Sequence, residues 1–161
     1  MLAFRALALA ALLAGCASQG TVTPLSSNNV PLPPASNWAL AVTGCPKASQ
    51  CAELRSVLAN QLVSSGLART VVPSGSMADL AVDLNVSNLR AVPTAVRVLF
   101  GAMAGRNEVA STATVRNPRN GAVLRSFQIK SESAAHPFSG ESMEVDAYKK
   151  LAAQMVEALR S

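Results

Sequence analysis

The sequence predicts an α+β fold: a two-layer sandwich in which two helices cover one face of a mixed or antiparallel sheet of about four to five strands. Three patterns support this prediction. Residues 79–88 alternate apolar and polar side chains, as a strand with one buried face does. Asn120-Gly121 lies between two further strand-like segments, which indicates a hairpin. Residues 52–64 and 141–160 carry apolar residues at helical spacing, so both segments can pack on the sheet.

The chain begins with a leader typical of exported proteins. Arg5 precedes the apolar residues 6–12, a run too short to cross a bilayer, and Leu13-Ala14-Gly15-Cys16 follows. This tetrapeptide resembles the lipobox of bacterial lipoproteins. The resemblance implies that residues 1–15 are a signal peptide, and that Cys16 carries a diacylglyceryl thioether and an acylated amino group, palmitate being a typical chain.

The anchor predicts the cellular location. We expect an envelope lipoprotein that faces the periplasm. The residue after Cys16 is Ala17 and not an aspartate, and this resembles the signals that sort lipoproteins to the outer membrane. Residues 16–37 are rich in Ser, Pro, Asn and Gly and are predicted to form a flexible tether. It would span about 25 Å as a coil and up to about 65 Å if extended.

Residues 38–161 are predicted to form a single α+β domain. Only 4% of the chain is aromatic, so its core should consist of Val, Leu and Ala. Gly66 is placed to end the first helix, and Glu141, Glu144 and Asp146 suit the first turns of the second. The expected elements are a strand at 38–42, a helix at 52–64, a short strand at 70–72, a strand at 79–88, a hairpin of 108–116 and 122–131, and a helix at 141–160.

Two cysteines remain once Cys16 is assigned to lipid. Cys45 and Cys51 form an even pair in an oxidising compartment, which favours a disulfide. A redox centre would need two cysteines at the closer C-x-x-C spacing. A structural zinc site needs four ligands, and these two cysteines and the single histidine supply only three. We therefore predict a structural cross-link.

The net charge is +5, and its excess lies in residues 90–130, which contain seven basic residues and the single acid Glu108. Such a stretch suits anionic lipid headgroups, lipopolysaccharide or an acidic protein, while solvated arginines at strand ends are the simpler interpretation. Nucleic acid is not expected to be a partner of an exported chain.

Residues 91–105 are apolar and punctuated by glycine where a polar loop would be expected. They form either a buried segment, part strand and part turn, that packs under the helices, or an exposed patch that contacts a partner or a membrane. The candidate contact residues of the exposed patch are Arg97, Leu99, Phe100, Met103 and Arg106.

No arrangement of residues points to catalysis, to a metal or to a cofactor. His136 is the single histidine, and no nucleophile motif or phosphate-binding loop is present. We expect a protein that is not an enzyme, and a hydrolase that uses His136 is the least favoured hypothesis.

The order of elements is similar to that of a family of bacterial lipoproteins known only as a domain of unknown function, over about residues 38–160. The resemblance rests on the helix at 54–62, on residues 67–72, on Ala78-Asp79-Leu80, on residues 97–106 and on the turn at 120–124. In layout such domains resemble the periplasmic helix-on-sheet domains of the curli secretion lipoprotein, penicillin-binding-protein activators and the amino-terminal part of the Tol translocation protein. The resemblance implies binding of other proteins and no catalytic residue.

The sequence therefore predicts a non-catalytic accessory or protein-binding module in cell-envelope assembly, with a membrane bound through Cys16 and an envelope protein as partner. The alternative is a binder of anionic lipid or cell-wall glycan.

Overall fold

A computed structural model describes residues 20–27, 32, 36–90, 92, 96, 99, 105–133 and 142–161. Several predictions from the sequence fall outside these residues. They concern the signal peptide, the lipidated Cys16, His136, and the contact residues Arg97, Phe100 and Met103.

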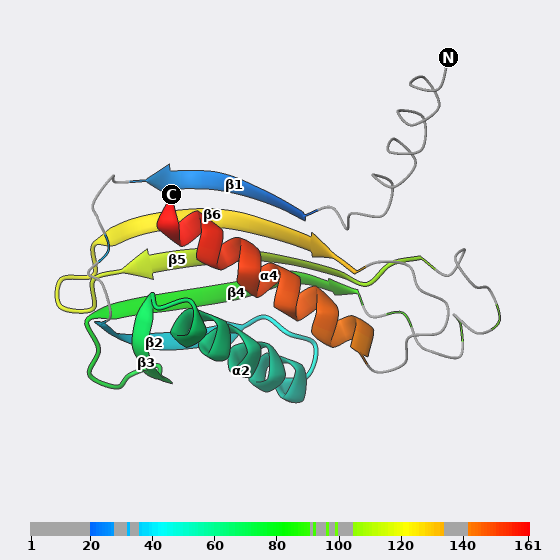
Figure 1. Cartoon of the computed structure of the whole chain (residues 1–161), viewed down its shortest axis with the longest axis horizontal. Helices are drawn as coiled ribbons and strands as arrows, with labels where there is room; N and C mark the ends of the chain where they lie inside the picture. Colours follow the sequence, from blue (N-terminus) through cyan, green and yellow to red (C-terminus); the bar gives the residue numbers. More distant parts are fainter. Residues whose placement is uncertain are drawn as a thin grey trace, which may run out of the picture.

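The described residues form six strands and two helices. In chain order these are β1 (Gly20–Ser27), β2 (Ser36–Thr43), α2 (Ala48–Ser64), β3 (Ala68–Pro73), β4 (Leu80–Arg90), β5 (Glu108–Arg116), β6 (Val123–Glu132) and α4 (Ser142–Arg160). The strands make one sheet in the order β1-β6-β5-β4-β2-β3 (Figure 1). β2 runs parallel to both β3 and β4, and all other neighbours are antiparallel, so the sheet is mixed.

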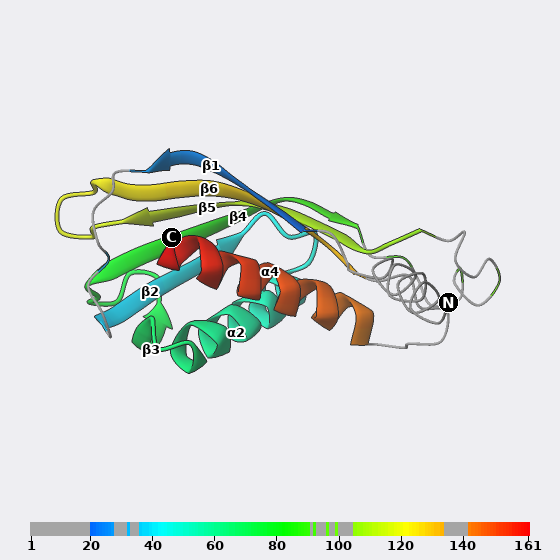
Figure 2. The ribbon, with the colours of Figure 1, turned by 45° about the horizontal axis from the view of Figure 1, so that its top comes forward.

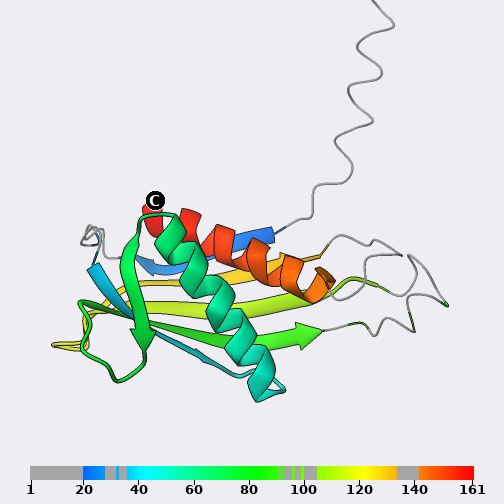
Figure 3. The same ribbon diagram turned by 60° about the horizontal axis from the view of Figure 1, so that its bottom comes forward.

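Both helices lie on the same face of the sheet, as Figures 2 and 3 show. The predicted α+β sandwich is confirmed, with six strands in place of four to five. The α2 stripe buries Leu54, Leu58 and Leu62, and the β4 residues that alternate toward the helices are almost fully buried. Leu, Val and Ala dominate this core, as expected, but the single Trp38 and single Tyr148 are also fully buried. The Trp38 indole Nε1–H donates to Ser36 Oγ at 2.7 Å, which satisfies its one polar atom.

The predicted tether is wrong for residues 20–27. This segment is β1, an edge strand that pairs with β6 from Gly20, opposite Ser131, to Ser27, opposite Arg125. The sequence pattern did not reveal it because the side chains of residues 20–26 are all exposed, so the strand has no alternating buried face. Backbone hydrogen bonding holds it, and Pro24, which lacks an N–H, is tolerated because the strand lies at an edge.

The β2–α2 connection contains the predicted disulfide. Cys45 and Cys51 are bonded, with their Cα atoms 5.6 Å apart. α2 begins at Ala48, four residues before the predicted start, so Cys51 lies within its first turns. Gly44, just before the cross-link, has φ +83°, and a Cβ there would clash with the carbonyl oxygen of Val86. The turn therefore requires glycine.

Loss of the cross-link is expected to destabilise the domain moderately. Cys45 and Cys51 are six positions apart in the sequence, so the disulfide closes a short loop. Loop entropy for so short a loop is about 2 kcal/mol, so replacing Cys45→Ser and Cys51→Ser together should lower the free energy of unfolding by about that amount. Urea unfolding of the double variant and of the oxidised wild type measures the difference. Reduced wild type is the matched control and should unfold with the variant; an unchanged midpoint in the double variant would contradict the stabilising role.

Candidate functional site

A groove of about 560 Å³ lies between the last turns of α4 and strands β1 and β6. Its walls combine apolar and polar side chains from three elements. Val22 and Pro24 come from β1, Arg125 and Phe127 from β6, and Gln154 and Glu157 from α4. In Figure 1 the C-terminal part of α4 lies beside β6 and β1.

The groove exists because α4 does not fully cover the edge strand. Val22 is 37% exposed, although its register partner Ile129 on β6 is fully buried. Near the start of β1, Gly20 allows a close approach of the helix, since a Cβ there would overlap the side-chain amide of Gln154. The groove extends from this contact along β1 toward the C-terminal end of α4, where Ala158 and Ser161 line it.

Arg125 ties the groove to the end of α4. Its guanidinium Nη1 donates to the carbonyl oxygens of Ala158 at 3.2 Å and Leu159 at 2.7 Å. These carbonyls lack partners within the helix, and a cation there also suits the helix dipole. From the sequence, Arg125 interrupts the apolar register and predicts a bulge or a strand end. The structure confirms an irregularity, because the β5–β6 register shifts between Val115, the partner of Arg125, and Arg116.

The polar atoms of the groove are suited to binding. The side-chain Oε1 of Gln154 is buried and has no hydrogen-bond partner in the part of the chain that the structure describes. A ligand that donates a hydrogen bond would satisfy it. Arg125 and Glu157 add one positive and one negative side chain to walls that are otherwise apolar or neutral. Ser26, Ser126 and Ser161 add hydroxyl groups to the same walls, so the groove offers further hydrogen-bond donors and acceptors.

Of the contact residues predicted from the sequence, the structure describes Leu99 and Arg106, which lie between β4 and β5 in the sequence and do not line the groove. Leu99 is 77% exposed and Val96 is 37% exposed, so at these two positions the exposed interpretation of residues 91–105 holds. Arg106 pairs with Glu132 at 3.3 Å. The groove and this predicted patch are therefore separate surfaces.

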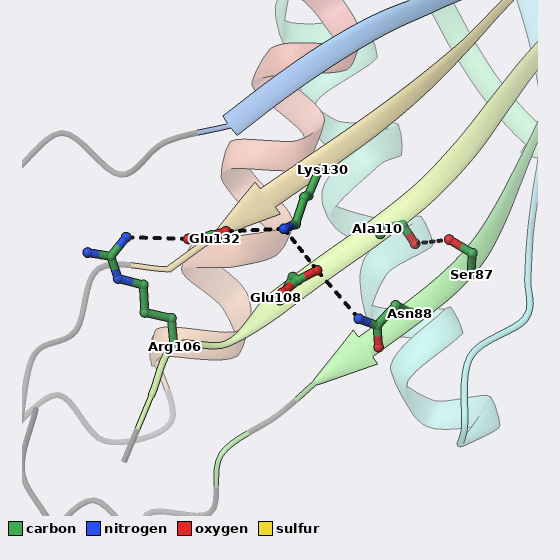
Figure 4. A network of polar contacts seen from close by, with 7 residues as sticks. All are labelled: Ser87, Asn88, Arg106, Glu108, Ala110, Lys130 and Glu132. Atoms are coloured by element: carbon green, nitrogen blue, oxygen red, sulfur yellow. Dashed lines mark hydrogen bonds and ion pairs between the residues drawn. The ribbon is translucent and has the colours of Figure 1, made fainter. Parts of the chain in front are cut away.

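Three of the seven basic residues in 90–130 pair with acids in the part of the chain that the structure describes. Lys130 contacts Glu108 at 3.3 Å and Glu132 at 3.5 Å, so a chain of ion pairs crosses the helix-free face (Figure 4). The hydrogen bond from Lys130 to Glu108 raises the pKa of this lysine, and the charges of Glu108 and Glu132 add to the effect. At the other end of the sheet Arg116 pairs with Asp83. The sequence could not show these pairings because their acids lie on other strands or outside the basic stretch.

A second polar cluster joins the N-terminal ends of the two helices. Tyr148 Oη donates to Glu144 Oε1 at 2.6 Å, and Gln50 Nε2 donates to the same oxygen at 2.8 Å. Burial, followed by the hydrogen bond to Glu144, raises the pKa of Tyr148, so its phenol stays neutral in water at any physiological pH. We interpret this cluster as a structural link between α2 and α4, which sequence patterns did not reveal.

No three histidine, cysteine or acidic side chains within the described ranges are grouped so as to hold a metal ion. No helix in those ranges is long and apolar enough to cross a membrane.

The fold is similar to that of solved bacterial proteins. No protein-family model matches the chain, and no curated protein matches it. The PelC L103M dodecamer from Paraburkholderia phytofirmans is 20% identical, with a TM-score of 0.63, and the match covers 89% of this chain and 98% of PelC. A second PelC dodecamer structure is 18% identical at the same TM-score and covers 89% of this chain and 99% of PelC. Lipoprotein GNA1162 from Neisseria meningitidis is 13% identical, with a TM-score of 0.46, over 76% of this chain and 98% of that one. The likeness to PelC shows a shared fold that spans nearly the whole of its chain.

The two hydrogen bonds of Arg125 should contribute measurably to stability. Replacing Arg125→Met removes both bonds and the favourable charge at the helix end, and we expect a loss of about 1–2 kcal/mol in the free energy of unfolding. Arg119→Met is the matched control, because this exposed arginine lies in the turn of the hairpin and hydrogen-bonds through its backbone. Denaturant unfolding of both variants gives the comparison. Equal stability of the two variants would show that Arg125 does not hold the helix end.

Proposed function

We propose that this chain is a membrane-anchored lipoprotein of the bacterial envelope, which acts as a non-catalytic accessory by binding protein. The leader and Cys16 support the anchor and an outer-membrane location facing the periplasm. The observation that carries the binding function is the groove between α4, β1 and β6. It joins apolar walls to an unpartnered amide oxygen and to one side chain of each charge, a mixture that suits a protein surface more than an ionic ligand.

A second copy of the chain is our proposed occupant of the groove. PelC, which has the same fold over almost its entire length, is a dodecamer, and this supports the idea that the fold can bind copies of itself. An accessory protein that self-associates can then present several copies of its outer surface to an envelope partner, which increases the effective concentration of each binding site.

The charge pattern supports protein binding over the alternative of an anionic lipid or glycan binder. Arg106, Arg116 and Lys130 are each paired with an acid, and Arg125 is hydrogen-bonded to the end of α4. Four of the seven basic residues in 90–130 are therefore engaged within the chain, which leaves less free charge than the sequence suggests.

Cross-linking in intact membranes tests the proposal. The wild type should give cross-linked oligomers of the chain that survive purification, identified by mass spectrometry together with any envelope partner. Val22→Glu should reduce the oligomers by about tenfold or more, because burying an unpaired carboxylate at the contact costs more than about 1.4 kcal/mol. Val63→Glu is the matched control: Val63 is 44% exposed, close to the 37% of Val22, and lies on α2 away from the groove.

Three other results would change the proposal. Equal oligomer yields from both valine variants would remove the groove as the contact. Capture of a single envelope protein without oligomers would keep the accessory function and replace the occupant. Recovery of phospholipid or cell wall alone, from folded protein, would favour the alternative. Cys16→Ser shows which contacts require the anchor.

A further inference from the structure

We infer that the end of the sheet where β1 begins rests on the lipid bilayer, with Leu99 inserted at the membrane surface. The inference depends on the proposed lipid anchor at Cys16 and goes beyond it, because an anchor alone does not orient a domain. It follows from three observations: the length of chain between anchor and sheet, the register that defines this end, and the exposed apolar side chains found there.

The anchor is only four residues from the sheet. β1 begins at Gly20, so three residues separate it from Cys16. Four steps along a fully extended chain cover at most about 14 Å. A flexible tether through residue 37 would have allowed up to about 65 Å. An acylated Cys16 at the bilayer surface therefore holds Gly20 within about 14 Å of the membrane.

The register places the two strands that flank Leu99 in the sequence at the same end. Gly20 pairs with Ser131, and the next residue of β6, Glu132, pairs with Glu108 at the start of β5. Glu108 in turn pairs with Arg90, where β4 ends. The end of β4 and the start of β5, between which Leu99 lies in the sequence, are therefore both at the end where β1 begins, and Figure 1 shows β4, β5 and β6 side by side there. The opposite end is about 33 Å away, since β6 has ten residues.

The chemistry at this end suits insertion of apolar side chains. Leu99 is 77% exposed and Val96 is 37% exposed. Amphipathic segments bury such side chains about 5–10 Å into the boundary between headgroups and acyl chains. Arg106 and Lys130 at this end are paired with Glu132 and Glu108, whereas Arg90 at the end of β4 adds an exposed positive charge. The inference assigns the contact to apolar insertion and not to these charges. The bilayer contact is therefore expected to persist at high salt.

Fluorescence quenching in proteoliposomes tests the orientation. The full lipidated chain carrying Leu99→Cys is labelled with an environment-sensitive fluorophore; the disulfide and the acylated Cys16 leave this thiol as the site of reaction. We expect a blue-shifted emission that brominated phospholipids quench at least twofold more than an aqueous quencher does. Met77→Cys is the matched control, because Met77 is 98% exposed and lies in the turn before β4, at the opposite end. Its label should remain accessible to the aqueous quencher.

The outcomes separate this inference from the anchor. If the protein floats with vesicles but the labels at positions 99 and 77 are equally exposed to water, the proposed orientation is wrong and the anchor still holds. Protein that does not float, like the Cys16→Ser variant, overturns the anchor itself and the inference with it. The measurement is repeated in about 1 M salt, where the Debye length is about 3 Å. Loss of lipid quenching there would overturn apolar insertion in favour of electrostatic contact.

Discussion

The antiparallel pairing of β1 with β6 is the interaction on which the other features of this protein depend. It turns residues 20–27 from a tether into the edge of the sheet and so sets how far the domain can lie from Cys16. The same pairing brings Val22 and Pro24 beside the end of α4, which creates the groove. Because the side chains of β1 are mostly exposed, this arrangement relies on backbone hydrogen bonds more than on apolar burial.

The parts of the fold that the sequence predicted are those in which burial imposes a period. β4 alternates apolar and polar residues because one face packs on the helices and the other meets solvent, and the Leu54, Leu58 and Leu62 stripe marks α2 for the same reason. Asn120-Gly121 marked the hairpin through its positive φ, which the structure shows at Gly121. The disulfide followed from cysteine count and compartment. These signals are local, so a single sequence contains them.

The features that the sequence did not predict depend on contacts between distant segments. Residues from β1, β6 and α4 line the groove, so the spacing of residues within any one of these segments does not predict it. Arg125 breaks an apolar register, but only the structure shows that it reaches the last carbonyls of α4. The ion pairs of Lys130 and Arg106 depend on which strands are neighbours. Basic composition alone therefore overstated the charge that is free to bind a partner.

Pro24 has a consequence for crowding on a membrane. Proteins confined to a surface meet at high local concentration, and an open sheet edge invites strands of neighbouring molecules to pair with it. Pro24 removes one donor from β1, and the register shift between Pro24 and Ser26 bends the ladder at the same point. The opposite edge, β3, is short and ends at Pro73. Both edges therefore resist growth of the sheet from one molecule to the next, and we expect an assembly of this chain to use side-chain packing more than strand pairing.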